Sequence, residues 1–292
     1  MHRIIENKTI SVHYINYTLL NMKKLFILAM AVLGVQGMQA QNEEFGLFDH
    51  MGGGISVGTD GIGIDLATPI TDMFALRAGV SFLPAIKVKE DIEIDDDGDS
   101  NTYYDEIEAQ FKLNKFDFKL LFDFYPIKNS SFHLTAGAFI GSSKFINVTN
   151  NSPILRKGPG GDHYDPAYDP ESEGLKLGNK YVSTDKNGNV DINLKVNAFK
   201  PYLGIGFGRA VPKKSRVTAS FDLGVQFWGK PGIYAMAADN KWDLANGVKK
   251  EMKFTADDLT DADSEDLQDA FDIMEKIVVY PVLNIRLTGR FF

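Results

Sequence analysis

FDFKLLFDF, residues 116–124, alternates apolar and polar side chains along most of its length. Phenylalanine or leucine fills the even positions, whereas Asp117, Lys119 and Asp123 stand at odd positions. A period of two is typical of a β-strand with one apolar and one polar face. The apolar face can point into a core surrounded by water, or it can point towards lipid around a membrane barrel with a polar interior. The orientation of this strand therefore decides the fold.

The same alternation recurs in residues 74–88, 216–228 and 279–291. The apolar faces are rich in phenylalanine, and the polar faces mix charges of both signs with small residues. The runs reach the roughly 9–11 residues that a tilted membrane strand needs. These features favour a membrane barrel.

The competing interpretation is a soluble lipocalin-like barrel with the pleat reversed. In that fold Phe116, Phe118 and Phe122 would point inwards, and Asp117 and Asp123 would point to solvent. Composition alone does not separate the two alternatives.

Tight turns alternate with long connections along the chain, as in barrels of the outer membrane. The short turns are expected at residues 71–72, 126–130 and 210–215, and the long connections at 89–105, 147–189 and 230–275. Seven strands are expected, at residues 62–70, 73–88, 107–125, 131–146, 190–209, 216–229 and 277–292. Because bacterial barrels usually have an even number of strands, we expect an eighth strand at residues 50–58. We therefore predict an all-β protein: a closed antiparallel transmembrane β-barrel of eight strands with long external loops. One short amphipathic loop helix is expected at residues 264–276.

GGGISVGTDGIGIDLATPI, residues 52–70, has the glycine density of a phosphate-binding loop. Its spacing does not fit G-x-G-x-x-G, and no lysine followed by serine or threonine is present. The residues that instead share the polar phase of two strands, joined by a turn at residues 59–61, are Gly52, Gly54, Gly58, Gly63 and Asp65. The stretch is interpreted as the first hairpin of the barrel, and no cofactor is expected.

The amino terminus has the features of an export signal. Residues 22–40 combine two lysines, a short apolar run and a small-residue end, which is too short to span a bilayer as a helix. Residues 1–21 are interpreted as an extension or a misplaced start, and residues 41–292 as the barrel domain. The chain has no cysteine, and residues 41–292 carry a net charge of −11, which argues against nucleic acid as a partner.

The interior of an eight-stranded barrel is just wide enough for side chains. Charges in such a narrow space need partners, because an unpaired buried charge is costly. We therefore expect a polar network that plugs the lumen, formed by Asp65, Arg77, Asp117, Lys119, Asp123, His133, Arg216, Asp222 and Arg286. A narrow channel for small solutes is the alternative.

Two further features bear on chemistry. The connection at residues 89–105 is acidic, and Asp95, Asp97 and Asp99 in it are weak candidates for calcium ligands. The closing glutamate of a calcium loop is missing, so the alternative is an acidic loop that is simply solvated. His163 lies in a Gly/Pro-rich connection beside two aspartates, which leaves an outer-membrane hydrolase as a third functional class. No catalytic motif is present, so an enzyme is not expected.

The chain ends on YPVLNIRLTGRFF, residues 280–292, an alternating strand that closes on aromatic residues. With the export signal and the alternating strands, this end resembles the small outer-membrane β-barrel proteins of Gram-negative bacteria, the porin-family or OmpA-like barrels. SVGTDGIGIDLATPITDMFALRAGVSF, residues 56–82, is similar to the first hairpin of such proteins. In the terminal strand the apolar phase falls on Phe291, so Phe292 departs from the pattern.

The resemblance implies residence in the outer membrane, in contact with its lipid and lipopolysaccharide. It also implies recognition of Phe292 by the barrel-assembly machinery. A structural or surface-interaction role is expected, with an extracellular partner bound through the connections at residues 89–105, 147–189 and 230–275. The ligand or partner itself is not identified by the sequence.

Overall fold

The computed structural model describes residues 50–93, 106–127, 129–150, 174–177, 179–213, 215–255, 258 and 265–291. The strands are β1 (Gly52–Gly58), β2 (Gly61–Pro69), β3 (Phe74–Glu93), β4 (Glu106–Phe124), β5 (Phe132–Gly141), β6 (Lys144–Asn150), β7 (Leu175–Leu177), β8 (Lys180–Val182), β9 (Asp191–Lys195), β10 (Phe199–Phe207), β11 (Val217–Phe227), β12 (Gly232–Ala238), β13 (Lys250–Phe254) and β14 (Val279–Arg290). The helices are α3 (Lys241–Ala245) and α4 (Glu265–Lys276).

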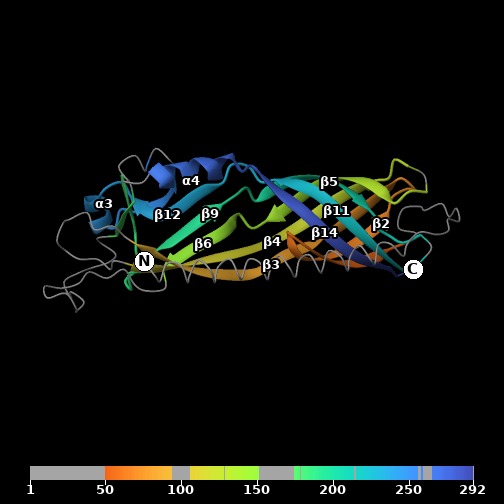
Figure 1. Ribbon diagram of the computed structural model, residues 1–292, viewed down its shortest axis with the longest axis horizontal. Coiled ribbons are helices and arrows are strands. Elements are labelled where there is room, and N and C mark those ends of the chain that lie inside the picture. Colours follow the sequence, from red (N-terminus) through yellow and green to blue (C-terminus); the bar gives the residue numbers. More distant parts are fainter. Residues whose placement is uncertain are drawn as a thin grey trace, which may run out of the picture.

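Eight strands pair in a closed antiparallel ring. The order is β1, β2, β3, β4, β5, β10, β11 and β14, and β14 pairs again with β1. The expected all-β fold with eight ring strands is confirmed, including the first hairpin, in which Gly58 pairs with Gly61. We call the end of the ring with the short turns and the carboxyl terminus the turn end, and the opposite end the loop end (Figure 1).

The pleat of β4 distinguishes between the two barrel types. Phe116, Phe118 and Phe122 are 43%, 60% and 47% exposed on the outside, whereas Asp117 and Asp123 are fully buried inside. The reversed pleat of a soluble barrel is therefore wrong for this chain. Polar side chains fill the ring, and apolar side chains cover its outer surface.

The apolar outer surface forms a continuous band around the ring. Its exposed members are Ile55, Val57, Ile62, Ile64, Leu66, Phe74, Phe82, Phe116, Phe118, Leu120, Phe122, Leu134, Ile140, Phe199, Leu203, Ile205, Phe207, Val217, Leu223, Phe227, Leu287 and Phe291. Phenylalanines gather at the turn end, where Phe74 stacks on Phe124 with ring centroids 4.9 Å apart. From Phe116 to Phe124 the strand runs about 26 Å, or about 20 Å of height at a tilt of about 40°.

Much of the long connections is regular structure, which the sequence interpretation did not anticipate. β3 and β4 continue as a hairpin up to Glu93 and Glu106, and β6, β9 and β12 add to the free side of β4. β8 and β13 then pair with β12. This extension, which we define as β6–β9, β12, β13 and the outer halves of β3 and β4, lies at the loop end with α3 and α4 (Figure 1).

The alternation changes phase where β4 leaves the ring. Towards the turn end the even residues Phe116 and Phe118 are apolar and face outwards. Towards the loop end the odd residues Phe111 and Leu113 are apolar instead, and they share the face of the buried Lys115. β3 makes the same change through a bulge between Leu83 and Ile86, which pairs Ile86 with Leu113. Around the cluster at Phe254 the extension has its apolar side chains inside, the reverse of the ring, whereas Ile86 and Val88 on β3 are 50% and 48% exposed.

α4 covers part of this inner face. Phe271 packs with Val182, Ala235 and Phe254, and Met274 lies against the same cluster. The expected helix at residues 264–276 is confirmed as α4, whose bounds are Glu265–Lys276. Among the described residues, no helix is long and apolar enough to cross a membrane.

We predict that the ring depends on close strand approach at Gly137. A Cβ atom there would lie 2.2 Å from the Leu120 carbonyl oxygen and 2.8 Å from the Leu121 Cα atom. Gly137→Val should lower the free energy of unfolding by several kcal/mol or prevent folding, because backbone cannot move away cheaply. Ala136→Val, on the exposed outer face of the same strand, should change it by about 0.5 kcal/mol or less. Urea unfolding after reconstitution in vesicles measures both, and equal effects would contradict the prediction.

Candidate functional site

Arg77 is the centre of the charged interior. Its guanidinium lies 2.6 Å from the Asp123 carboxylate and 3.1 Å from the Asp222 carboxylate. It also donates a hydrogen bond to Thr135. Since β3 and β11 are four places apart in a ring of eight, the Arg77–Asp222 pair crosses the full width of the lumen.

Two further groups complete this layer. His133 Nε2 lies 2.8 Å from Asp222 Oδ1, and its other ring nitrogen lies 3.2 Å from the Ser131 carbonyl oxygen. Lys119 forms an ion pair with Asp65 at 2.9 Å and donates to the Ser56 hydroxyl. Apart from the local contact between His133 and Ser131, these contacts join different strands, so the network ties the ring together across its interior.

A second charged layer lies nearer the loop end. Asp117 accepts ion pairs from Lys200 at 2.7 Å and from Lys115 at 3.2 Å. Lys115 also donates to Gln226 at 2.8 Å. Asp60, in the turn between β1 and β2, is 1% exposed, and burial raises the pKa of its carboxyl, partly offset by the nearby Lys119 and Lys115.

Aromatic and apolar side chains close both ends of this polar interior. At the loop end the rings of Phe145, Trp228 and Tyr280 pack together with centroids 4.9–5.9 Å apart, and Lys115 Nζ lies 4.9 Å from the Tyr280 centroid. At the turn end Ala67, Ala75, Tyr125, Ala210 and Val211 form a buried cluster. The lumen is thus closed at both ends, with the charged layers between them.

The buried charges of the described residues balance. The acids are Asp60, Asp65, Asp117, Asp123 and Asp222, and the bases are Arg77, Lys115, Lys119, Lys200 and Arg286, with His133 beside them. Ser56, Asp65 and Arg286 line a small cavity in this network. Both terminal nitrogens of Arg286 lack a hydrogen-bond partner among the described residues, so the cavity has the polar wall that a buried water requires. No ring of one sign that would select an ion is formed by these described groups.

The structure brings together eight of the nine residues expected in the lumen: Asp65, Arg77, Asp117, Lys119, Asp123, His133, Asp222 and Arg286. Arg216 is the exception. β11 begins only at Val217, so Arg216 belongs to the preceding turn and is exposed. The expectation that it faces the lumen is wrong.

Three buried charges were missed by the sequence interpretation. Lys200 shares the even phase of Tyr202, opposite the apolar Phe199 and Leu203, so alternation could have identified it. Lys115 shares the odd phase of Asp117 and Lys119, so alternation could have identified it as well, whereas Asp60 stands in a turn and no periodic signal marks it.

The metal and catalytic candidates fall elsewhere. Asp95, Asp97 and Asp99 lie outside the described residues, as does His163. Within the described ranges, no group of three or more His, Cys, Asp or Glu side chains could hold a metal ion. The calcium and hydrolase hypotheses stay predictions.

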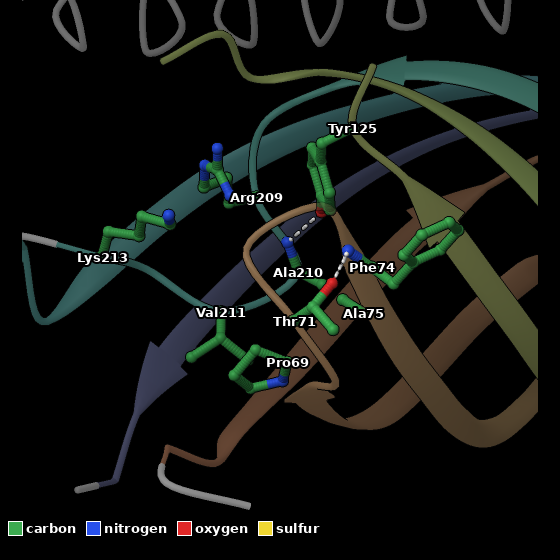
Figure 2. Close-up of a pocket in the computed structure, with 9 residues that line it drawn as sticks. All are labelled: Pro69, Thr71, Phe74, Ala75, Tyr125, Arg209, Ala210, Val211 and Lys213. Carbon is green, nitrogen blue, oxygen red and sulfur yellow. Dashed lines mark hydrogen bonds between the residues drawn. The ribbon is translucent and has the colours of Figure 1, made fainter. Parts of the chain in front are cut away.

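A second polar feature lies at the turn end. Figure 2 shows Arg209 and Lys213 on one side of a shallow pocket and Phe74 on the other, with Tyr125 between them. The Arg209 guanidinium lies 4.7 Å from the centre of the Tyr125 ring, and the Tyr125 hydroxyl accepts a hydrogen bond from the Ala210 amide at 2.8 Å. Burial holds the pKa of Arg209 below its ordinary value. The pocket thus combines cations with an apolar wall.

The chain matches no family model and no curated protein. Two solved structures from Acinetobacter baumannii are similar to it. CarO2 shares 16% identity, with a TM-score of 0.41 and coverage of 86% of this chain and 100% of that chain. CarO shares 15% identity, with a TM-score of 0.38 and coverage of 82% and 96%. Similarity at this level assigns neither a family nor a function.

We predict that Lys119 neutralises Asp65 in the lumen. Lys119→Met leaves the Asp65 carboxylate buried without its cation and should lower the free energy of unfolding by about 3–5 kcal/mol. The double variant Asp65→Asn/Lys119→Met removes both charges and should recover most of the loss. Urea unfolding in vesicles, followed by tryptophan fluorescence, measures the difference. A double variant no more stable than Lys119→Met would show that the pair is not coupled.

Proposed function

We propose that this protein is an integral outer-membrane β-barrel that anchors a structured surface extension, and that its lumen does not conduct. The observation that carries the proposal is the polarity of the ring, with balanced charges inside and a continuous apolar band outside. Monomeric proteins in water rarely expose a contiguous apolar surface of this extent. A closed ring also satisfies the backbone hydrogen bonds that lipid cannot.

The height and edges of the band support a bilayer as its surroundings. The roughly 20 Å estimated for β4 is close to the about 25 Å apolar band of outer-membrane barrels, and aromatic girdles are typical at both edges. Phe82, Phe116 and Phe199 are exposed near the loop end, and Phe74 and Phe207 near the turn end. The change of phase at Asn114–Lys115 supports the same boundary, because the outer face of β4 becomes polar immediately beyond it.

The extension supports a role at the surface. It has its own apolar cluster around Phe254 and Phe271, so it is a folded unit and not a set of simple loops. The exposed Trp242, on α3, is 72% accessible and gives this unit an apolar contact point distant from the ring. We propose that the extension binds an extracellular partner while the ring holds it in the membrane.

We predict that a charge is tolerated on the outer face of β4 only beyond the phase change. Phe118→Arg places a guanidinium in the band and should cost about 2–4 kcal/mol, with loss of insertion into vesicles. Asn114→Arg, four residues along the same outer face, should insert normally. Heat-modifiable gel migration after reconstitution reports both variants. Normal insertion of Phe118→Arg would contradict membrane embedding.

We predict that the wild-type protein shows no steady conductance in planar lipid bilayers, because ion pairs and aromatic rings fill the lumen. Tyr280→Ala combined with Trp228→Ala should leave the ring intact and the charged layer in place, so conductance should stay absent. A steady, open current from the wild-type protein would favour the narrow-channel alternative.

A further inference from the structure

The turn end carries a concentration of positive charge that the anchoring role does not use. For this count the turn end comprises residues 70–73, 125–131, 208–216 and 290–291. By sequence these segments contain six basic residues and one acid, Asp72, in a chain whose net charge is −8. Among those described are Arg209, Lys213, Arg216 and Arg290. Basic side chains at this density attract anionic lipid surfaces.

Two of these cations are positioned by the fold. Arg209 donates to the carbonyl oxygens of Asp72 and Ser130, both at 3.3 Å, while its guanidinium covers the Tyr125 ring. Lys213 Nζ lies 2.5 Å from Asp72 Oδ1, and the Lys213 carbonyl accepts a hydrogen bond from Arg290 at 2.9 Å. The Asp72 carboxylate thus contacts Lys213, whereas Arg209 is held by backbone carbonyl oxygens; no acid is among the described residues that line the pocket, so positive charge is in excess there.

The pocket is continuous with the apolar band. Phe74 lines it and is 44% exposed to the surroundings of the ring, and Pro69 and Val211 form its other apolar walls (Figure 2). A ligand seated there would place an anionic group beside Arg209 and Lys213 and a hydrocarbon part beside Phe74. Guanidinium and ammonium groups together bind phosphate oxygens strongly.

We infer that the turn-end pocket of Arg209, Lys213 and Phe74 binds the phosphate headgroup of a membrane phospholipid whose acyl chains lie along the band. The inference rests on the proposed function and adds a specific ligand class to it. Lipid is the source, and not free phosphate, because the apolar wall and the cations share one pocket at the edge of the band. The site would hold the ring at a set depth in the leaflet on the turn-end side.

The test is native mass spectrometry of the full chain released from non-ionic detergent with added phosphatidylglycerol. The wild-type protein should retain one lipid. The variant Arg209→Gln/Lys213→Gln should lose affinity for the lipid by about tenfold or more, as expected for lost charge-assisted hydrogen bonds. The matched control Lys87→Gln/Lys89→Gln removes two exposed lysines of the extension and should bind like the wild type. Diacylglycerol with the same acyl chains should not be retained.

Three results would overturn the inference: equal lipid retention by the turn-end variant, equal retention of diacylglycerol, or displacement of the lipid by millimolar inorganic phosphate. If the double variant does not fold, Lys213→Gln alone should still weaken binding several-fold relative to the control, and no weakening would refute the site. Heat-modifiable migration in phosphatidylcholine vesicles is measured in parallel. Failure of the wild-type protein to insert refutes membrane embedding. If the wild-type protein inserts but the turn-end variant retains as much lipid as the wild type, only the headgroup site is refuted.

Discussion

Ten charged side chains are buried inside a ring of eight strands, and their mutual neutralisation is the constraint on which the rest of the structure depends. In so narrow a lumen an unpaired charge costs several kcal/mol, so most charged positions on one strand meet an opposite charge on another, although Asp60 lies in a turn and Arg286 donates to the Ser220 hydroxyl. Arg77 meets this requirement across the full diameter, with Asp123 on the neighbouring strand and Asp222 on the opposite one. Ring closure and charge pairing therefore support each other, because the paired charges lie on different strands of the ring.

The same constraint accounts for glycine on the inner face. A Cβ atom at Gly79 would lie 2.5 Å from Asp65 Oδ1, and one at Gly206 would lie 2.5 Å from His133 Nε2. The charged side chains occupy the space that these residues leave vacant. Glycine density in a small barrel thus reflects the volume of neighbouring ionic side chains, which explains why residues 52–70 resemble a phosphate-binding loop in composition but not in spacing.

Alternation predicted the ring well, since a period of two depends only on which face a residue occupies. It placed Asp117 and Asp123 inside and the phenylalanines of β4 outside, as observed. It failed where periodicity ends: Arg216 precedes the first residue of β11, and Asp60 lies in a turn. The extension was missed for another reason. Its strands alternate as regularly as those of the ring, but their apolar phase is opposite. Alternation in a sequence shows that a strand has an apolar and a polar face, but not which of the two faces water.

That reversal is informative about the surroundings of each part. β4 is one continuous strand, yet its apolar residues change from the inner to the outer face at Asn114–Lys115, where the paired strand β3 bulges between Leu83 and Ile86. The reversal fits a change of surroundings along the strand, which is what the proposed membrane boundary requires. The buried charges of the described lumen balance, whereas by sequence residues 89–105 carry eight acids and the turn-end segments carry six basic residues and one acid. The unbalanced charge of the chain therefore lies outside the ring interior, so we propose that charged partners meet the protein there and not in the lumen.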